Sequence, residues 1–380
     1  MKQFSFIAIL LVIPIAFIEL MAGWFSAHFN TELFSYRNEY LRTVKADQFH
    51  RFIESPYFDA RLGWNNPKQF TRVTRRNCIG QAIKYVYESG ARQTPGTTLE
   101  QAQIALFGES YTQGEEVGSE STIASVLTNR HGLPTANYGV NSYDPLQATE
   151  KFQELVSRPH SLNAAVLLIM HENVWRLVNS FKPIYHPYYS EWFFGLKPYV
   201  RRGEIIELDY PRTYDDFLNR AEQLFRSDHW AKPERKFPYS LSTVQAVFSN
   251  TFTQRSRALL QGRFRHEYES EEFRRDLSAV IDRFVSTAEA SAIAPYVIFI
   301  PRAGDTYRVS ESFVAAENKR LGRTLAFEFV DPEIEWGKYK LAPYPDSCHP
   351  SPYGYARIAD FVAKVIGQRP AAREGPAIID

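Results

Sequence analysis

The sequence has little cysteine: Cys78 and Cys348 are its two cysteines among 380 residues. They lack C-x-x-C spacing, so they cannot form a metal site by themselves, although they could pair as one disulfide or stay as free thiols. The charges nearly cancel, with 44 basic and 43 acidic side chains and a net charge of +1, which gives no indication of a nucleic-acid partner. The sequence also lacks a G-x-S-x-G elbow, a P-loop, a dinucleotide fingerprint and internal repeats, which disfavours the common α/β-hydrolases and nucleotide-binding proteins.

The amino-terminal segment is the longest apolar run. From Phe4 to Phe25 it carries one charge, Glu19, and at about 1.5 Å per residue it could cross the roughly 30 Å hydrocarbon layer of a bilayer. We therefore expect residues 1–27 to form an uncleaved membrane anchor that places the rest of the chain on the extracytoplasmic side of the inner membrane, in the periplasm. A cleaved signal peptide is the alternative that stays open.

The rest of the chain is globular in composition, with 44% apolar and 15% aromatic residues. Residues 28–98 are polar and aromatic without a clear period, and we expect a linker with short helices. The main domain is expected over 99–366. Residues 367–380, rich in Pro, Ala and Gly, are expected to form a flexible tail.

Short apolar runs alternate with helical patterns from residue 99 onward. Five runs are expected to be strands, at 103–107, 135–140, 163–170, 295–301 and 324–331. Helical patterns separate them, and one of these ends at Gly132, a typical C-cap. Apolar strands that alternate with helices indicate a parallel sheet covered on both faces, an α/β sandwich.

A long segment interrupts this pattern between the third and fourth strands. Residues 175–290 are charged and aromatic with helix-like stretches, and loops of this length are uncommon within compact domains. We expect a helical insertion over one edge of the sheet, which serves as a lid, as a docking surface or only as structural elaboration.

Polar residues follow the strands directly, at the edge where open α/β sheets bind ligands. They are Ser110 after the first strand, Gly139 and Asn141 after the second, Asn173 after the third, and Asp346 with His349 after the last. Ser351 and Pro352 then begin a helix, as N-cap and first-turn residue.

These residue types match the requirements of acyl transfer. A serine hydroxyl becomes a good nucleophile when an imidazole takes its proton, and the imidazole acts best when a carboxylate holds its other nitrogen. Asp346 and His349, three residues apart, could form that pair. The backbone N–H groups of Ser110 and Gly139 and the Asn173 amide could bind the developing oxyanion.

Two competing interpretations are less favoured. His171 is not accompanied by an H-E-x-x-H or similar metal-binding pattern, so no metal is expected. Cys348 lies next to His349 in sequence, yet Ser110 has the better strand-end position for a nucleophile.

Four stretches resemble the blocks of the SGNH (GDSL-type) hydrolases, a family of esterases, lipases and carbohydrate O-acetyl esterases or transferases. They are "FGESYTQGEEV", "NYGVNSYDPLQA", "HEN" and "PDSCHPSPYGYARIADF", in that order. The stretch "HENVWRLVNSFKPIYHPYY" is also similar to a membrane-anchored bacterial branch. The resemblance implies a flavodoxin-like three-layer α/β/α sandwich (the SGNH hydrolase fold), with Ser110 as nucleophile, His349 as base, Asp346 as its orienter, and Gly139 and Asn173 in the oxyanion hole.

The sequence therefore predicts a serine-dependent ester hydrolase, an O-deacylase or acetylesterase that acts on acylated carbohydrate or small esters without a metal or organic cofactor. An O-acetyltransferase of exopolysaccharide or cell-wall modification would use the same acyl-enzyme, so this alternative stays open. The family's Gly-Asp-Ser is Gly108-Glu109-Ser110 here and the flanks of Asn173 differ, which keeps a non-catalytic glycan-binding scaffold as a third possibility. The substrate and the oligomeric state are not predicted.

Overall fold

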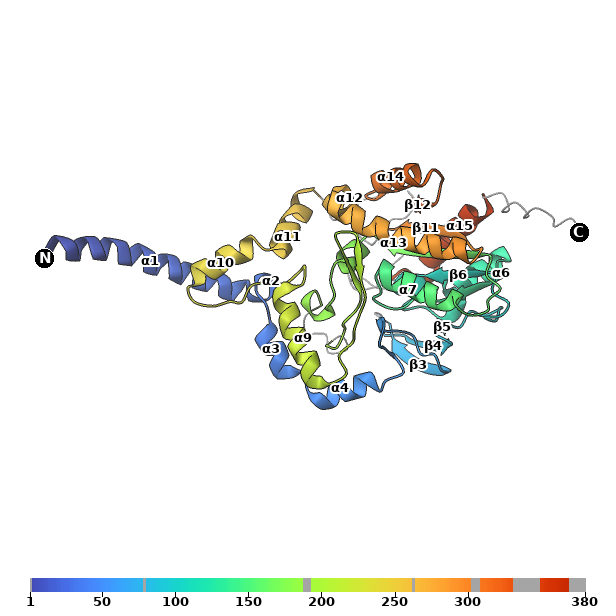
Figure 1. The fold of residues 1–380 in the computed structure, drawn as a ribbon, viewed down its shortest axis with the longest axis horizontal. Helices are drawn as coiled ribbons and strands as arrows, with labels where there is room; N and C mark the ends of the chain where they lie inside the picture. Colours follow the sequence, from blue (N-terminus) through green and yellow to red (C-terminus); the bar gives the residue numbers. More distant parts are fainter. Residues whose placement is uncertain are drawn as a thin grey trace, which may run out of the picture. The chain divides into compact units, whose positions relative to one another are not determined.

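The computed structural model describes residues 2–77, 80–186, 193–261, 264–301, 308–330 and 349–368 (Figure 1). The chain divides into two compact units. The first, here called the helical unit, comprises Met1–Ser55, Asn179–Lys197 and Asp209–Gln261. The second, here called the sheet unit, comprises Pro56–Val178, Pro198–Leu208 and Gly262–Asp380.

The sheet unit is built on an eight-stranded sheet with the strand order β12-β11-β8-β6-β7-β5-β4-β3. Its strands are β3 (Thr71–Arg76), β4 (Ala82–Glu88), β5 (Ala91–Arg92), β6 (Ile104–Phe107), β7 (Thr135–Asn137), β8 (Ala164–Met170), β11 (Ala294–Ile300) and β12 (Ala326–Glu328). The strands β7, β6, β8, β11 and β12 are parallel. Numbered along the chain, these five strands have the order 2-1-3-4-5 of flavodoxin-like sheets. The predicted α/β class and strand alternation are thus confirmed.

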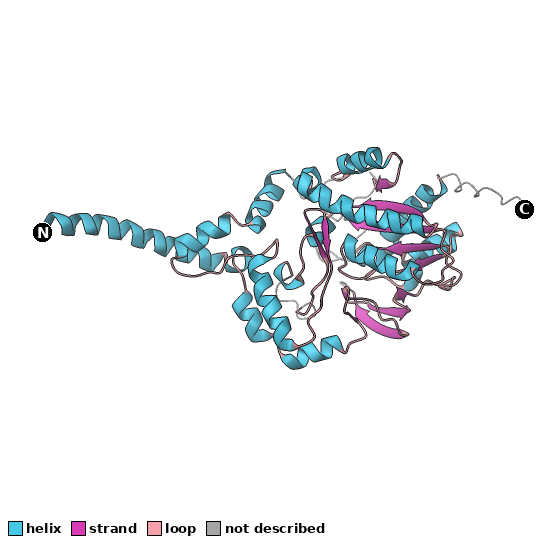
Figure 2. Ribbon diagram, in the orientation of Figure 1, coloured by secondary structure: helices cyan, strands magenta, loops and turns pink. Residues whose placement is uncertain are grey.

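Helices cover both faces of this sheet (Figure 2). They are α5 (Ser110–Gln113), α6 (Ile123–His131), α7 (Pro145–Val156), α8 (Asn173–Leu177), α12 (Arg265–Glu269), α13 (Glu271–Ala290), α14 (Glu311–Leu321) and α15 (Pro352–Gly367), with a short 3-10 helix at Ser119–Ser121. Two small hairpins, β1 (Phe58–Asp59) with β2 (Gly63–Trp64) and β9 (Tyr199–Arg201) with β10 (Glu204–Ile206), complete the unit.

Alternating side chains of the strands separate the two core layers. Ile104 and Leu106 of β6 face α6 and α15 in one buried apolar cluster. Phe107 faces the opposite side, where its ring packs on Phe152 of α7, which in turn packs on Phe284 of α13. The helices α7 and α13 lie side by side on this face (Figure 1). Because successive strand residues point to opposite faces, both layers are apolar, which gives the expected three-layer sandwich.

Two segments differ from the expectation. Residues 71–92, expected within a linker, add the antiparallel strands β3, β4 and β5 to the sheet. Their apolar signal is weak because β3 has no buried residue, β4 buries only Tyr85, Val86 and Tyr87, and β5 has two residues. Helix α13, expected within the insertion, packs on the sheet through an apolar face that includes Leu277, Ile281 and Phe284.

The helical unit packs around aromatic side chains. Its helices are α1 (Lys2–His28), α2 (Asn30–Leu33), α3 (Arg37–Thr43), α4 (Ala46–Ile53), α9 (Tyr214–Ser227), α10 (Tyr239–Val247) and α11 (Asn250–Gln261), with a 3-10 turn at Lys182–Ile184. Tyr40 contacts the rings of Phe181, Phe193 and Phe225 at centroid distances of 5.1–5.7 Å. These contacts join Tyr40 of α3 to Phe225 of α9 and to the rings of Phe181 and Phe193.

Among the described residues, no helix is both long enough and apolar enough to span a bilayer. The membrane anchor expected over residues 1–27 stays a prediction. Several other predicted features lie outside the described residues, namely Cys78, Cys348, Asp346 and nearly all of the tail.

Candidate active site

Ser110 begins helix α5, three residues after β6 ends, at the carboxyl edge of the sheet. Gly108 makes this sharp exit possible, because a Cβ there would lie 2.7 Å from the carbonyl oxygen of Leu168. Ser110 is buried, and its hydroxyl donates to Oε2 of Glu109 at 2.8 Å. The apolar strand thus ends where the sequence analysis placed a nucleophile.

Glu109 is the N-cap of α5, and it is fully buried. Its Oε2 also accepts a hydrogen bond from the Tyr111 N–H at 2.8 Å, whereas Oε1 has no hydrogen-bond partner among the described residues. Burial raises the pKa of this carboxyl group, and the Tyr111 bond and the charge of Arg176 oppose the rise. Ser110 is therefore held by an acid with an unsatisfied oxygen.

Gly139 lies against the turn that carries Ser110. A Cβ at this position would collide with the Gln113 backbone nitrogen and would lie 2.6 Å from the carbonyl carbon of Thr112. The absence of a side chain thus permits close approach of the two backbones. The Gly139 N–H donates to Oδ1 of Asn137 at 3.1 Å, so a role in the oxyanion hole requires this bond to be exchanged.

Asn173 begins α8 after β8, the strand on the other side of β6. Its side chain is buried, and Oδ1 has no hydrogen-bond partner among the described residues. Arg176 is three residues further along α8, donates to the Tyr143 carbonyl at 3.3 Å and pairs with Glu172. This places a guanidinium group beside the loop that follows β7.

His349 reaches the site from the residues just before α15. Its ring packs edge-on against the ring of Tyr111 at a centroid distance of 5.6 Å. Nδ1 of His349 lies 3.7 Å from Oε1 of Glu116, and the His349 N–H donates to Oε2 of Glu116 at 3.3 Å. No hydrogen bond joins His349 to Ser110 in the part of the chain that the structure describes.

The loop after α5, residues 114–117, is here called the post-serine loop. Arg92 on β5 is completely buried and donates to the carbonyl groups of Gln113, Gly114 and Val117. The hydroxyl of Tyr355 on α15 donates to the Glu115 carbonyl at 3.0 Å. A buried cation and a buried tyrosine thus fix the loop that carries Glu116.

The structure brings together four of the five predicted residues at one edge of the sheet: Ser110, Gly139, Asn173 and His349. Asp346 lies outside the described residues. The sequence analysis did not identify Arg92, Glu116 or Arg176 as site residues. The stretch "GEEV" of the post-serine loop was the available signal for Glu116, but charged turn residues are common and carry no chemical meaning without a contact.

Across the described ranges, no group of three or more His, Cys, Asp or Glu side chains is arranged to hold a metal ion. The chemistry that the described residues can perform is nucleophilic attack by a hydroxyl group, proton transfer by an imidazole and hydrogen bonding by amides. Three buried polar atoms at this edge have no hydrogen-bond partner among the described residues: Asn173 Oδ1, Glu109 Oε1 and His349 Nδ1. Such atoms are typical of a site that a ligand or water completes.

No family model matches the sequence, and no curated protein matches it either. Among solved structures, the chain is similar to a protein assigned to the lipolytic G-D-S-L family from Desulfitobacterium hafniense DCB-2, with 13% identity over 69% of this chain and 98% of the other, at a TM-score of 0.34. A member of the lipolytic G-D-S-L family from Veillonella parvula DSM 2008 has 12% identity over 70% of this chain and 98% of the other, at a TM-score of 0.33. At these values the functional interpretation rests on the residues of this chain.

Proposed function

We propose that the chain is a serine-dependent ester hydrolase of the SGNH type that removes acyl groups from carbohydrate outside the cytoplasm. One observation carries the proposal: Ser110 leaves the central strand β6 at the carboxyl edge of the sheet, and His349 packs on the adjacent Tyr111. Open α/β sheets bind ligands at this edge. The carbohydrate substrate rests on the resemblance of the sequence blocks, and the location outside the cytoplasm rests on the apolar amino-terminal segment.

The proposed reaction has two steps. Oγ of Ser110 attacks the ester carbonyl while His349 takes the hydroxyl proton, and the alcohol leaves with that proton as the acyl carbon–oxygen bond breaks. Water then attacks the acyl-enzyme, again with His349 as base, and releases the acid. Gly139 and Asn173 are the proposed oxyanion donors, and Asp346 is the proposed orienter of His349, with Glu116 as a second carboxylate beside its ring.

The bond from Ser110 to Glu109 must break before this reaction can begin. In the structure the hydroxyl points to Oε2 of Glu109, so the side chain has to rotate before it donates to an imidazole. Hydrogen bonds of catalytic groups are often long or misaligned without substrate and form only in the complex. The same bond favours a second candidate, a non-catalytic glycan-binding scaffold in which Glu109 holds Ser110 permanently.

Hydrolysis of p-nitrophenyl acetate by the full-length protein at neutral pH distinguishes the two candidates. Ser110→Ala is expected to lower kcat/KM at least about 100-fold, because removal of a nucleophile eliminates the acyl-enzyme route. Ser286→Ala on the exposed side of α13 is the matched control and should leave the rate unchanged. A mass shift of one acetyl group on wild type, absent from Ser110→Ala, would identify the intermediate.

Equal background rates in wild type and Ser110→Ala would contradict the hydrolase proposal. An added sugar acceptor extends the same assay: a burst of p-nitrophenol that becomes continuous turnover only with the acceptor would identify an acyltransferase. Glycan binding without turnover, both with and without the sugar acceptor, would identify a non-catalytic glycan-binding scaffold.

A further inference from the structure

A polar cavity beside α7 belongs to the sheet unit and has no part in the proposed ester chemistry. Its volume is about 150 Å³, and its lining residues are Asn65, Lys68, Ser89, Gly90, Tyr138, Lys151, Glu154, Leu155 and Arg158. An engineered apolar cavity of about this volume holds benzene. The space is therefore large enough for a phosphate, sulfate or carboxylate group.

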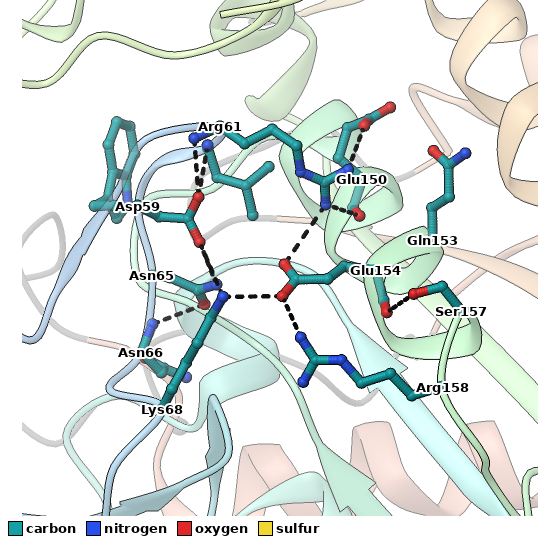
Figure 3. Close-up of polar contacts among 12 residues, drawn as sticks. Asp59, Arg61, Asn65, Asn66, Lys68, Glu150, Gln153, Glu154, Ser157 and Arg158 are labelled. Atoms are coloured by element: carbon teal, nitrogen blue, oxygen red, sulfur yellow. Dashed lines mark hydrogen bonds and ion pairs between the residues drawn. The ribbon is translucent and has the colours of Figure 1, made fainter.

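Positive charge exceeds negative charge around this cavity. Its lining includes three cationic side chains but a single carboxylate, Glu154. Lys68 and Arg158 both contact Oε1 of Glu154 at 2.9 Å, from two sides (Figure 3). A third cation, Arg61, lies 3.6 Å from the other oxygen of Glu154. Arg61 also pairs with Glu150 at 3.2 Å, and Lys68 lies 3.9 Å from Asp59, so the excess positive charge of the cavity comes from Lys151.

Lys151 is the cation of this cavity that has no carboxylate within ion-pair distance in the described part of the chain. It is 5% exposed, and its amino group donates to the Gly90 carbonyl at 2.7 Å. The amino group also lies 5.6 Å and 6.0 Å from the ring centroids of Tyr138 and Tyr143. An ammonium group has three N–H donors, so the bond to the Gly90 carbonyl leaves donors that a further acceptor can use.

Burial also changes the protonation equilibrium of the Lys151 amino group. Burial lowers the pKa of Lys151 to about 7, Asp59 and Glu154 oppose the change, and Lys68 reinforces it. The neutral amine of Lys151 is therefore accessible near neutral pH. An anion beside the amino group would favour its charged form, so binding of an anion would be coupled to uptake of a proton.

We propose that this cavity is a binding site for a small oxyanion and that Lys151 is its central donor. The shared chemistry is a phosphate, sulfate or carboxylate group, which arrives either as a free ion or as the acidic group of a glycan. Lys68 and Arg158 supply the other charges at the rim, and both have exposed side chains that can turn from Glu154 to the ligand.

The position of the cavity connects it to the candidate active site. Tyr138 directly precedes Gly139, and Tyr143 accepts a hydrogen bond at its carbonyl from Arg176. Both tyrosine rings face Lys151. A bound oxyanion would therefore contact the segment that places Gly139 against α5. Binding itself does not depend on Ser110 chemistry, so it can succeed or fail independently of the proposed hydrolase activity.

Calorimetric titration of the full-length protein with sodium sulfate tests the site, because sulfate does not itself titrate near neutral pH. At about pH 8, with two buffers of different ionisation heat, we expect nearly one proton to be taken up for each sulfate bound, and at about pH 5.5 almost none. Lys151→Met should weaken binding at least about tenfold, since it removes the central donor. Lys84→Met, on the exposed side of β4, is the matched control and should bind as wild type does.

A second measurement uses the unaltered protein, so that it stays informative if Lys151→Met misfolds. Cyanate carbamoylates neutral amines, and saturating sulfate should slow modification of Lys151 at least about tenfold by converting it to the ammonium form and covering it. Modification of Lys84 in the same sample should not change. Absence of sulfate binding in wild type, equal binding by Lys151→Met, or unprotected Lys151 would each overturn the proposal.

Titration with galacturonate and with galactose separates the two ligand sources. Tighter binding of galacturonate than of sulfate, with no binding of galactose, would support the site and assign it to an acidic glycan. Tighter binding of sulfate than of galacturonate would support the site and assign it to a free oxyanion.

Discussion

Glu116 contacts both the ring and the backbone of His349. Its Oε1 lies 3.7 Å from Nδ1 of the imidazole, and its Oε2 accepts a hydrogen bond from the His349 N–H at 3.3 Å. Glu116 adopts a left-handed backbone conformation with a φ of 68°, and its own N–H donates to the hydroxyl of Tyr85 at 2.8 Å. Non-glycine residues seldom adopt this conformation, and surrounding contacts have to hold it. The post-serine loop therefore presents a carboxylate to the proposed base.

Glu116→Gln is expected to lower kcat about 10–100-fold and to leave KM nearly unchanged. The substitution keeps the shape of the side chain but removes the charge of the carboxylate that accepts the His349 N–H bond and lies beside Nδ1. A hydrogen bond to a charged group contributes about 1.5–3 kcal/mol, and each 1.36 kcal/mol changes a rate about tenfold. Steady-state hydrolysis of p-nitrophenyl acetate measures both constants. Glu120→Gln, at an exposed position in the adjacent turn, is the matched control.

Asp346→Asn provides the comparison for this experiment, because the sequence analysis assigned the orienting role to Asp346. If Asp346→Asn abolishes turnover while Glu116→Gln behaves as wild type, Glu116 has no positioning role. Loss of kcat in both variants would show that two carboxylates act on His349.

Arg92→Met should destabilise the post-serine loop. Arg92 is buried, its guanidinium lies 4.4 Å from the Tyr85 ring centroid, and it donates to three backbone carbonyl groups. Removal of the cation takes away three charge-assisted hydrogen bonds. Among the described residues it leaves the Val117 carbonyl without a donor, whereas Asn137 still donates to Gln113 and the Val117 N–H to Gly114. A hydrogen bond to a charged group contributes about 1.5–3 kcal/mol, and an unsatisfied buried group costs about 1–3 kcal/mol. Urea unfolding is expected to show a loss of at least about 2 kcal/mol, and kcat is expected to fall as it does in Glu116→Gln.

Arg75→Met is the control for this variant. Arg75 also lies near the Tyr85 ring, but its side chain is 42% exposed and its closest carboxylate, Glu115, is 3.7 Å away. An exposed ion pair contributes about 0–1 kcal/mol, so the stability loss should be small. Equal losses in both variants would argue against a special role of Arg92 in holding the loop.

The sequence predicted the central sheet because its strands are short, continuous apolar runs. β8, for example, is buried at every residue, and a strand that is apolar on both faces is readily recognised. Two helix boundaries were also predictable. Gly132 ends α6 with a φ of 65°, and Ser351 caps the start of α15 by accepting a hydrogen bond from the Gly354 N–H. Local chemistry determined both ends.

The contacts of the candidate site were less predictable. Ser110 follows from its place after β6, but the Ser110 bond to Glu109 depends on the exact path of the turn. Arg92 is a buried cation in a two-residue strand, where polarity indicates exposure and not a core position. Glu116 contacts His349 across 233 residues of sequence, a relationship that no local pattern can indicate.

Gly139→Ala should lower both stability and activity. A Cβ at this position would meet the backbone of Thr112 and Gln113, not a flexible side chain that can move away. Overpacking costs about 1–3 kcal/mol, and a backbone neighbour favours the upper end of that range. Thermal unfolding and p-nitrophenyl acetate hydrolysis measure the two effects. Gly367→Ala, where nothing lies within 4 Å of the added Cβ, should match wild type in both.

Glu109 should make the stability of the protein decrease with rising pH. Burial raises the pKa of its carboxyl group in the folded chain. At pH values between the unfolded-state pKa of about 4.3 and the raised folded-state pKa, Glu109 is therefore protonated in a larger fraction of folded chains than of unfolded chains. The contribution of Glu109 to stability is greatest below that window and decreases as pH rises through it.

Glu109→Gln removes this titration while keeping an acceptor oxygen for the Tyr111 N–H and the Ser110 hydroxyl. The unfolding free energy of Glu109→Gln minus that of wild type should therefore increase as pH rises above the unfolded-state pKa of about 4.3, by up to about 1.4 kcal/mol for each pH unit within the titration window. Urea unfolding at several pH values measures the difference, and Glu120→Gln should show no such trend.

A difference that decreases with pH would mean that the bonds from Tyr111 and Ser110, with the charge of Arg176, outweigh burial. In that case Glu109 is an ionised carboxylate at neutral pH and accepts a hydrogen bond from the Ser110 hydroxyl. Rotation of this hydroxyl toward His349 then has a higher barrier, because a charge-assisted bond must break.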